Sequence, residues 1–417
     1  MNYNHASIKI INSDIKSKII KLPFYLINFS SFKFQIKGIM MKVTYILLIC
    51  IILSPLMFGQ MKNSRNIPFS WKTDTTKTEI DLSEISIVMP RGSFQVLNYP
   101  EFYGKEEGLK NFYSKEPIIF VEINDQARAY SLNMLSVHEI ANDTLGGVPI
   151  LTTFCPLCNS GVIYDRRLTF NGKEHLLEFE VSGMLRKSDM VMADKQTETW
   201  WQQLMGEAIV GELEGANLKV IPSLVISVEE FFNRFPNGKI LSKSAGDEES
   251  QKYYGQNFYK NYDASDGKPY GRFFDPNSLD QRLPPMERIV DIRSLGEFKV
   301  YTFSKAKEMG VINDEFNSKN IVIFYKPGLV SILDKKDITQ SKDIGTVTVF
   351  NSLLEGEILT FRKEGEIFID NNTNSNWDIT GRCYKGKLKG KELDIEPHGN
   401  HFAFAWLAFH PETKIYE

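Results

Sequence analysis

The sequence predicts a β-rich α+β fold made of two tandem copies of one mainly antiparallel β domain, of which the second copy is degenerate. Two observations lead to this prediction. The chain of 417 residues contains 29 Phe, 17 Tyr and 5 Trp, and aromatic side chains pack well on pleated surfaces. In addition, two long stretches repeat the same residues at a nearly constant spacing, which indicates an internal duplication.

The duplication is inferred from residues that recur in the same order. The matched pairs are Tyr130 with Tyr301 and Asn142 with Asn313 at an offset of 171; Asp194 with Asp370, Thr197 with Thr373 and Trp201 with Trp377 at 176; and Gly206 with Gly381, Leu218 with Leu393 and Pro222 with Pro397 at 175. The two copies span residues 112–243 and 286–417. Chance does not readily produce so many matches in one order, so we expect both copies to fold alike.

Four other segments complete the predicted domain organisation. For residues 1–40 we expect an over-extended gene start, with Met40 or Met41 as the true first residue. Residues 41–59 have the form of a secretory signal, because Lys42 precedes a mostly apolar run that is short for a transmembrane helix. Residues 60–111 form an N-terminal extension, and residues 244–285 form a connecting loop rich in turn formers and tyrosine. The sequence thus predicts an exported protein of the periplasm or cell envelope, without a stable membrane span after signal cleavage.

The charge balance excludes one class of partner. The formal net charge is -3, and no basic stripe interrupts the sequence, so we expect no binding to nucleic acid. A nucleotide site is not indicated either, since the chain has neither a G-x-x-x-x-G-K-[ST] motif nor a well-placed G-x-G-x-x-G motif.

Local patterns predict the elements of the first copy. Pro117–Tyr130 reads as a hairpin, because Asn124 and Asp125 stand between two apolar runs. Leu132–Ala141 has helical spacing and is followed by Asn142 and Asp143, which we expect in a turn. Val148–Phe154 and Val162–Tyr164 read as strands on either side of the C-P-L-C segment, and Val228–Arg234 reads as a helix.

Cys155 and Cys158 are the main candidate site residues. They directly follow a predicted strand in the segment T-F-C-P-L-C-N-S-G. Two cysteines at this spacing can form a redox-active pair, bind a soft metal ion or close a structural disulfide. In the redox interpretation Cys155 is the nucleophile and Cys158 the resolving thiol. Covalent haem is excluded, because position 159 is Asn and not His.

His138 and Glu139, in S-V-H-E-I-A-N-D, are the further candidates. On the predicted helix His138 and Asn142 share a face. At an offset of 171, His138 corresponds to Met309 and Cys155 to Lys326, so these candidates are specific to the first copy. His138 is expected either to face the site, where it would lower the pKa of the thiols or serve as a third metal ligand, or to cap or pack at the end of the helix. Weaker candidates are four charged residues of the first copy, taken mainly as solvated: Arg166, Arg186, Lys187 and Asp189. The two histidines of the H-G-N-H cluster, His398 and His401, are also weaker candidates.

These motifs support a family resemblance. The segments S-V-H-E-I-A-N-D, T-F-C-P-L-C-N-S-G, S-G-M-L and D-K-Q-T-E-T-W-W resemble a widespread bacterial and archaeal family with a T-[FY]-C-P-L-C-x-[ST]-G signature, known only as a domain of unknown function. Some members of that family carry selenocysteine in the motif. The resemblance therefore implies redox chemistry at Cys155 or Cys158.

The sequence leaves two main functional hypotheses. The first is an exported protein with a redox-active Cys155–Cys158 pair. It would act as a thiol–disulfide oxidoreductase on envelope thiol proteins or small thiols, and it would need no cofactor. The second is a non-enzymatic envelope protein that binds copper or zinc through Cys155, Cys158 and His138. A scaffold or ligand-binding module with a structural disulfide is a third reading.

Overall fold

The structure is a computed structural model that describes residues 71–417. The predictions for residues 1–40 and for the signal at 41–59 lie outside the described residues. Within residues 71–417 the protein is β-rich, with mainly antiparallel sheets and short helices. None of the helices in this part of the chain is long and apolar enough to cross a membrane.

The N-terminal extension contributes edge strands to the sheets that contain strands of the first half. Its elements are η3 (Leu82–Glu84), β1 (Ile85–Ile87), β2 (Leu97–Asn98), β3 (Phe102–Tyr103) and α2 (Lys105–Asn111). Strand β1 pairs with β11, β2 with β6 and β3 with β16. The extension therefore edges three different sheets.

The first half consists of strands and two short helices. Its elements are β4 (Pro117–Ile123), β5 (Gln126–Ser131), α3 (Leu132–His138), β6 (Ile140–Leu145), β7 (Val148–Cys155), β8 (Ser160–Asp165), β9 (Arg167–Phe170), β10 (Lys173–Leu176), β11 (Phe179–Arg186), β12 (Asp189–Asp194), β13 (Trp200–Gln202), β14 (Glu207–Val210), β15 (Leu224–Ser227), α4 (Val228–Arg234) and β16 (Lys239–Leu241). The hairpin β4–β5, the strands β7 and β8 and the helix α4 agree with the sequence predictions.

The connecting segment has little regular structure. It contains η4 (Lys243–Ala245), α5 (Glu248–Gln251) and η5 (Pro276–Ser278). The ring centroids of Tyr262 and Tyr270 lie 4.7 Å apart, and Tyr262 also packs on Phe402 at 6.0 Å. Aromatic side chains therefore pack against one another in this segment.

The second half follows the same order of elements. They are β17 (Arg288–Ser294), β18 (Glu297–Thr302), α6 (Phe303–Met309), β19 (Val311–Phe316), β20 (Lys319–Lys326), η6 (Ile338–Gln340), β21 (Thr346–Asn351), β22 (Leu353–Leu354), β23 (Glu357–Ile358), β24 (Phe361–Glu364), β25 (Ile367–Asp370), β26 (Asn376–Trp377), β27 (Cys383–Lys385), β28 (Asn400–Phe402), α7 (Ala403–Phe409) and β29 (Lys414–Ile415).

Strand pairing in the two halves has the same scheme. The first half has the order β15-β4-β5-β16 and the second has β28-β17-β18-β29, each with a parallel pair at its end. The indole nitrogen of Trp201 donates to Asp194 over 3.0 Å, and that of Trp377 donates to Asp370 over the same distance. A carboxylate therefore holds a buried tryptophan in both halves. Cys383, in β27, is also buried.

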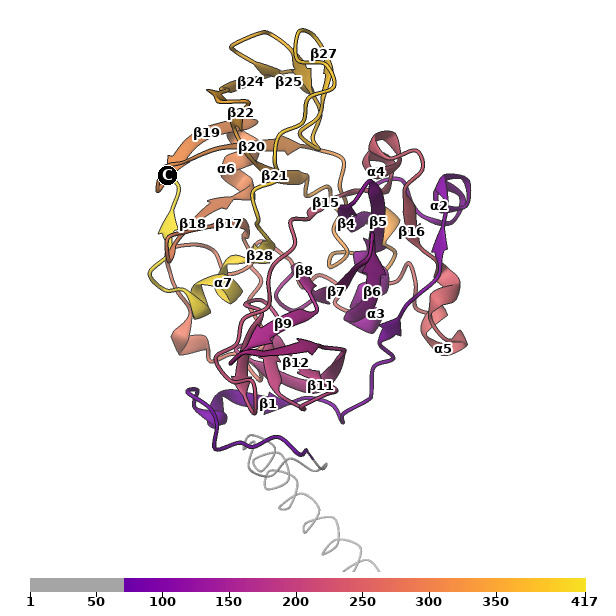
Figure 1. Cartoon of the computed structure of the whole chain (residues 1–417), viewed down its shortest axis with the longest axis vertical. Helices are drawn as coiled ribbons and strands as arrows, with labels where there is room; N and C mark the ends of the chain where they lie inside the picture. The colour runs from indigo at the N-terminus through magenta and orange to yellow at the C-terminus, as the bar shows by residue number, and fades with distance from the viewer. Residues whose placement is uncertain (1–70) are drawn as a thin grey trace, which may run out of the picture. The chain divides into compact units, whose positions relative to one another are not determined.

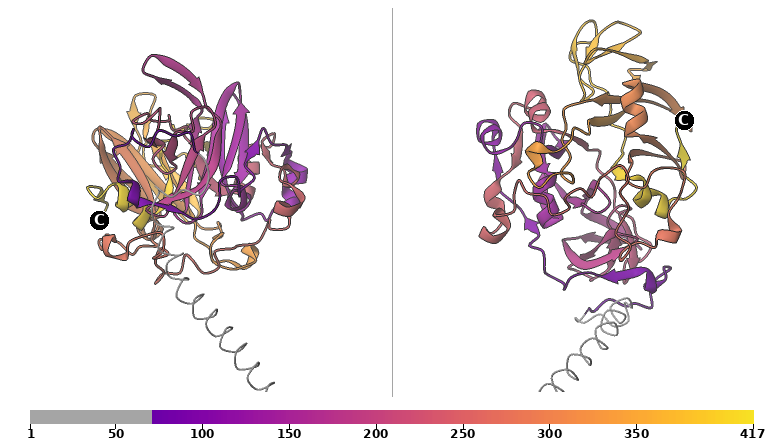
Figure 2. Two further views of the ribbon diagram at one scale, coloured as in Figure 1. Left: turned by 90° about the horizontal axis from the view of Figure 1, so that it is seen from below. Right: turned by 180° about the vertical axis from the view of Figure 1, so that it is seen from behind.

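One eight-stranded sheet joins the halves. Its order is β2-β6-β7-β8-β28-β17-β18-β29, so β28, from the second half, lies between β8 and β17 (Figure 1). The largest apolar core cluster likewise contains residues from both halves. Figure 2 shows the strands of the first half, violet to magenta, beside those of the second, orange to yellow.

The prediction of a helix over Leu132–Ala141 is wrong in its second part. Helix α3 ends at His138, because Glu139 adopts φ 58° and the chain continues as strand β6. The expected turn at Asn142 and Asp143 is also wrong. The Asn142 side chain bonds the backbone of Phe179, donating to its oxygen and accepting from its nitrogen, both at 2.9 Å. Asn313 makes the same two bonds to Phe361 in the second half.

Candidate functional site

The two cysteines lie at the end of strand β7 and in the short loop that leads to β8. Cys155 pairs with Ser160 across the two strands. The loop brings the sulfur atoms of Cys155 and Cys158 to 3.2 Å from each other, without a disulfide bond. Both side chains are buried, with exposed fractions of 1% and 0%. The proximity predicted from their spacing is thus present.

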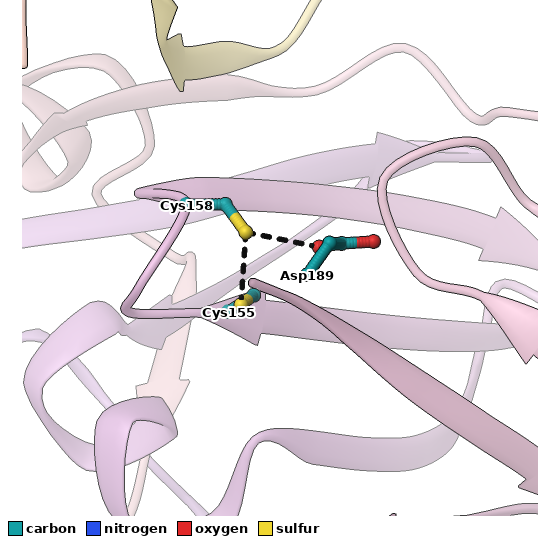
Figure 3. Close-up of side chains that lie close together, drawn as sticks. All are labelled: Cys155, Cys158 and Asp189. Atoms are coloured by element: carbon teal, nitrogen blue, oxygen red, sulfur yellow. Dashed lines mark hydrogen bonds between the residues drawn. The ribbon is translucent and has the colours of Figure 1, made fainter. Parts of the chain in front are cut away.

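A third side chain, Asp189, approaches the sulfurs from another sheet. It begins strand β12, after a two-residue turn in which Lys187 and Ser188 both have positive φ, as expected for a tight hairpin. Oδ1 of Asp189 lies 3.2 Å from the sulfur of Cys158, and the Ser188 carbonyl oxygen lies 3.3 Å from it (Figure 3). Within residues 71–417, Cys155, Cys158 and Asp189 form the single group of three side chains placed to hold a metal ion.

Asp189 is fixed by bonds to its second oxygen. Oδ2 accepts from the side-chain amide of Gln202 at 2.6 Å and from the backbone nitrogen of Leu204 at 3.0 Å. Burial raises the pKa of Asp189 above its ordinary value, while these donors and the Cys158 thiol oppose that rise. The carboxyl group is therefore a buried proton acceptor held directly against a thiol.

The thiols are electrostatically disfavoured as anions in this closed state. Burial raises the pKa of Cys155, and the nearby carboxyls of Asp189 and Glu139 add to the effect. Burial raises the pKa of Cys158 further, with contributions from Cys155 and Asp189. Burial therefore favours the protonated form of both thiols.

Glu139 is a neighbour of this group and is held in an unusual conformation. It ends helix α3 with φ 58° and ψ -30°, whereas the second half has Gly310, with φ 72° and ψ -39°, at the end of α6. A non-glycine residue in this region costs on the order of 1 kcal/mol. Burial, together with the charge of Asp189, raises the pKa of Glu139 to about 8. The strain and the shifted pKa make Glu139 a candidate acid near the thiols.

His138 faces away from the sulfurs. Its Nδ1 lies 2.5 Å from the carbonyl oxygen of Gln95, and its Nε2 lies 2.6 Å from the hydroxyl of Tyr254. Burial lowers the pKa of His138. Both ring nitrogens are therefore engaged elsewhere, and Asp189 takes the position that the sequence analysis gave to His138.

The connecting segment and the second half cover the cysteines. The hydroxyl of Tyr262 donates to the carbonyl oxygen of Leu157 at 3.1 Å. The backbone nitrogen of Phe402 donates to the carbonyl oxygen of Cys158 at 2.8 Å. The backbone nitrogen of Ser188 donates to Phe273 at 3.1 Å. Reaction with any molecule larger than a small ion therefore requires these covering segments to move.

Sequence reasoning named Asp189 as a charge of the first copy but did not place it at the cysteines. The L-R-K-S-D-M segment signals a hairpin turn, since polar residues separate two apolar runs. It carries no signal of which other sheet the turn meets. Arg166, another of these charges, is buried and bonds the carbonyl oxygens of Ile150 and Leu177, which gives it a structural role.

Comparisons with known proteins identify the family of the chain. No curated protein and no solved structure showed significant similarity to the chain. A family model matches residues 96–413, which include both halves of the structure and the dithiol site. The chain therefore belongs to the family described as "Protein of unknown function (DUF3179)".

Proposed function

We propose that the protein is a thiol–disulfide oxidoreductase whose redox centre is the Cys155–Cys158 pair, with Asp189 as the proton acceptor for Cys158. The contact between the Cys158 thiol and Asp189, at 3.2 Å, is the observation that carries the proposal. A buried carboxyl group at this distance supplies what a resolving thiol needs, namely a place for its proton at the moment of attack.

The reaction with a disulfide substrate proceeds in two steps. After the covering segments open, Cys155 loses its proton and attacks one sulfur of the substrate, forming a mixed disulfide and expelling the first substrate thiolate, which takes up a proton in place of the one that Cys155 lost. Cys158 then gives its proton to Asp189 and attacks the sulfur of Cys155, which expels the second substrate thiolate; this thiolate takes up the proton released by Cys158. The cysteine pair is oxidised to a disulfide and the substrate is reduced to two thiols, so that two electrons are transferred.

Glu139 and the family resemblance support this chemistry. A carboxyl group with a pKa of about 8 is protonated at neutral pH and can donate a proton to a departing thiolate. The T-[FY]-C-P-L-C-x-[ST]-G signature, with selenocysteine in some resembling proteins, implies that the motif is used for thiol exchange.

A redox titration tests the proposal. Mature protein is equilibrated in glutathione buffers of stepped potential and quenched with acid. Its intact mass is then measured by mass spectrometry, in which the loss of two hydrogens reports disulfide formation. We expect a reversible Cys155–Cys158 disulfide with a potential above about -300 mV. A disulfide that resists reduction far below that value would favour a structural bond, and the absence of any disulfide would overturn the proposal. The Cys155→Ser variant is the control for assignment of the bond.

A second candidate function is metal binding, which the convergence of three ligands favours. Cys155, Cys158 and Asp189 offer two sulfurs and one oxygen within 4.8 Å of one another. This mixed set suits zinc better than copper(I), which prefers sulfur alone. Tetrahedral zinc with bonds of about 2.3 Å needs sulfurs about 3.8 Å apart. The observed 3.2 Å therefore requires only a small separation of the thiols.

Metal analysis distinguishes the two candidates. Protein purified without chelator is assayed for zinc and copper, and its thiols are counted before and after chelator treatment. Near-stoichiometric metal that protects both thiols, and is lost in Asp189→Ala, would put metal binding first. A metal-free protein with two reactive thiols supports the redox proposal.

Export and the internal duplication are part of the same proposal. We propose that residues 41–59 direct the protein to the periplasm or cell envelope, where thiol proteins or small thiols are its partners; the apolar run after Lys42 supports this. The matching strand orders and the matched Asp–Trp pairs support descent of the two halves from one domain. Protease protection in spheroplasts and N-terminal sequencing of the mature protein test the export.

A further inference from the structure

We propose that His401, oriented by Asp291, is the proton-relay residue through which the second half of the chain takes part in chemistry at the dithiol site. The inference rests on the proposed redox function and assigns a role to a segment that carries no cysteine of the pair. Neither residue belongs to the three-residue group formed by Cys155, Cys158 and Asp189.

The sheet places His401 on the same face as the cysteine pair. Cys155 is paired with Ser160, and Asn400 is paired with Gly161, in the eight-stranded sheet. Since neighbouring residues in a strand point to opposite faces, the side chains of Cys155, Ser160 and His401 share one face. The backbone contact from Phe402 to Cys158, at 2.8 Å, fixes β28 directly beside the cysteine loop.

Asp291 orients the imidazole ring. Nε2 of His401 lies 3.1 Å from Oδ1 of Asp291, and both side chains have an exposed fraction of 0%. Arg293 donates to the other oxygen of Asp291 at 2.8 Å, and its charge holds the pKa of Asp291 below the ordinary value in spite of burial. Asp291 is therefore ionised and accepts a hydrogen bond from the N–H group of Nε2. The lone pair of Nδ1 then remains available.

Two side chains on this face, Ser160 and His401, each have a buried polar atom without a partner. Nδ1 of His401 and Oγ of Ser160 are buried, and neither has a hydrogen-bond partner among residues 71–417. Buried polar groups without partners are rare in folded proteins and indicate a site that binds water or a reacting group. The charged and titratable groups around His401 are Asp291 and Arg293 from β17, Tyr164 from β8, Asp189 from β12, and His398 and His410 from the segments that flank β28 and α7.

Stability does not explain this ion pair. The pairing of Pro117 with Ser227 in the first half corresponds to that of Arg288 with Phe402 in the second. Counting along these strands, Ile226 and Phe120 stand where His401 and Asp291 stand. An apolar pair thus fills the same place in the first half, and replacing a buried ion pair by apolar residues is often neutral or stabilising. The charged pair occurs in the copy that lies against the thiols, which points to chemistry.

The relay completes the second step of the exchange. Cys158 transfers its proton to Asp189 as it attacks the sulfur of Cys155 and displaces the substrate thiolate. Nδ1 of His401 then accepts that proton from Asp189 through the polar face and passes it to the departing thiolate. The thiolate leaves as a thiol, His401 and Asp189 return to their starting states, and no further reactant is consumed.

The test compares His401→Gln with His398→Gln in the full mature chain. Oxidised glutathione is the probe, and the rate at which the mixed disulfide resolves is measured by acid quench and mass analysis between pH 5 and 9. We expect His401→Gln to slow resolution about 100-fold at pH 7 and to flatten the pH profile, because general acid catalysis is lost. His398, whose Nδ1 lies 2.7 Å from the Glu396 carbonyl oxygen, should be replaceable with little change.

The outcomes separate this inference from the proposed function. Reversible disulfide formation in the wild type, with an unchanged rate and pH profile in His401→Gln, would overturn the relay and leave the redox function intact. A wild type that forms no disulfide would overturn both. If His401→Gln does not fold, as judged by its melting curve, Asp291→Asn replaces it; this variant keeps an acceptor for Nε2 but removes the charge, and a wild-type rate in it would also overturn the relay.

Discussion

The thiol of Cys158 donates a hydrogen bond to the carboxylate of Asp189 across 3.2 Å, although Cys158 follows a strand of one sheet and Asp189 begins a strand of another. Both groups are buried; Asp189 raises the pKa of the Cys158 thiol, whereas the hydrogen bond from that thiol lowers the pKa of Asp189. Their protons are therefore coupled, and the pair titrates as a unit. The packing of the two sheets thus sets the chemistry available to the cysteines.

Replacement of Asp189 by Asn should separate hydrogen bonding from proton transfer. The amide oxygen can still accept from the thiol, but it cannot take the proton, so oxidation by glutathione disulfide at pH 7 should slow about 100-fold. Acid-quenched mass analysis measures the rate. Asp165→Asn is the matched control, because Asp165 is also buried but pairs with Arg167. Equal rates in Asp189→Asn and wild type would remove Asp189 as the base.

The two cysteines should behave differently when each is replaced by serine. Cys158→Ser leaves Cys155 to attack glutathione disulfide but removes the resolving thiol, so a stable mixed disulfide should accumulate. Cys155→Ser removes the proposed nucleophile and leaves only the proposed resolving thiol, so little adduct should form. Intact mass after incubation at pH 8 measures both. A reversed pattern would exchange the assigned roles of the two thiols.

Glu139 should make the protein less stable as the pH rises. Its folded-state pKa of about 8 lies above the ordinary value of 4.5, so between these values the unfolded chain loses a proton that the folded chain keeps. This group's contribution is most favourable below pH 4.5, and it falls by about 1.4 kcal/mol per pH unit until about pH 8. Glu139→Gln should remove this slope in urea melts at pH 5, 6, 7 and 8. An unchanged slope would contradict the shifted pKa.

Asp194 and Asp370 should be equally important for stability. Each accepts from a tryptophan indole at 3.0 Å and from the backbone nitrogen of a threonine three residues later. Replacement of either by Ala leaves buried donors unsatisfied and should cost about 3 kcal/mol of unfolding free energy. Thermal or chemical melts of the two variants measure this. A large difference between the two costs would contradict the proposed descent of the two halves from one domain.

Local signals account for the parts of the fold that the sequence predicts. The β4–β5 hairpin is predictable because Asn124 and Asp125 tolerate positive φ, and both adopt it, at 49° and 60°. The helix that begins at Leu132 is predicted three residues too long. Its end depends on the left-handed conformation of Glu139, a residue that carries no local sign of a helix end.

The candidate site is predictable only where its residues are close in the sequence. Cys155 and Cys158 are three residues apart, so their proximity follows from their spacing. Asp189 and His401 arrive through the packing of one sheet on another and through the pairing of β28 with β8, which joins residues 239 positions apart at Gly161 and Asn400. Hydrophobic patterning identifies such strands but does not specify which distant strand becomes the neighbour.

The place of β28 between β8 and β17 has a consequence for the order of events during biosynthesis. Every other strand of that sheet except β29 emerges from the ribosome before β28. Until β28 has been made, β8 has an open edge and the cysteine loop lacks its contact with Phe402. At that stage the cysteine loop is therefore covered less completely than in the finished fold. Oxidants, thiol-transfer enzymes and metal ions of the compartment in which folding finishes have their freest access to the cysteines at that stage.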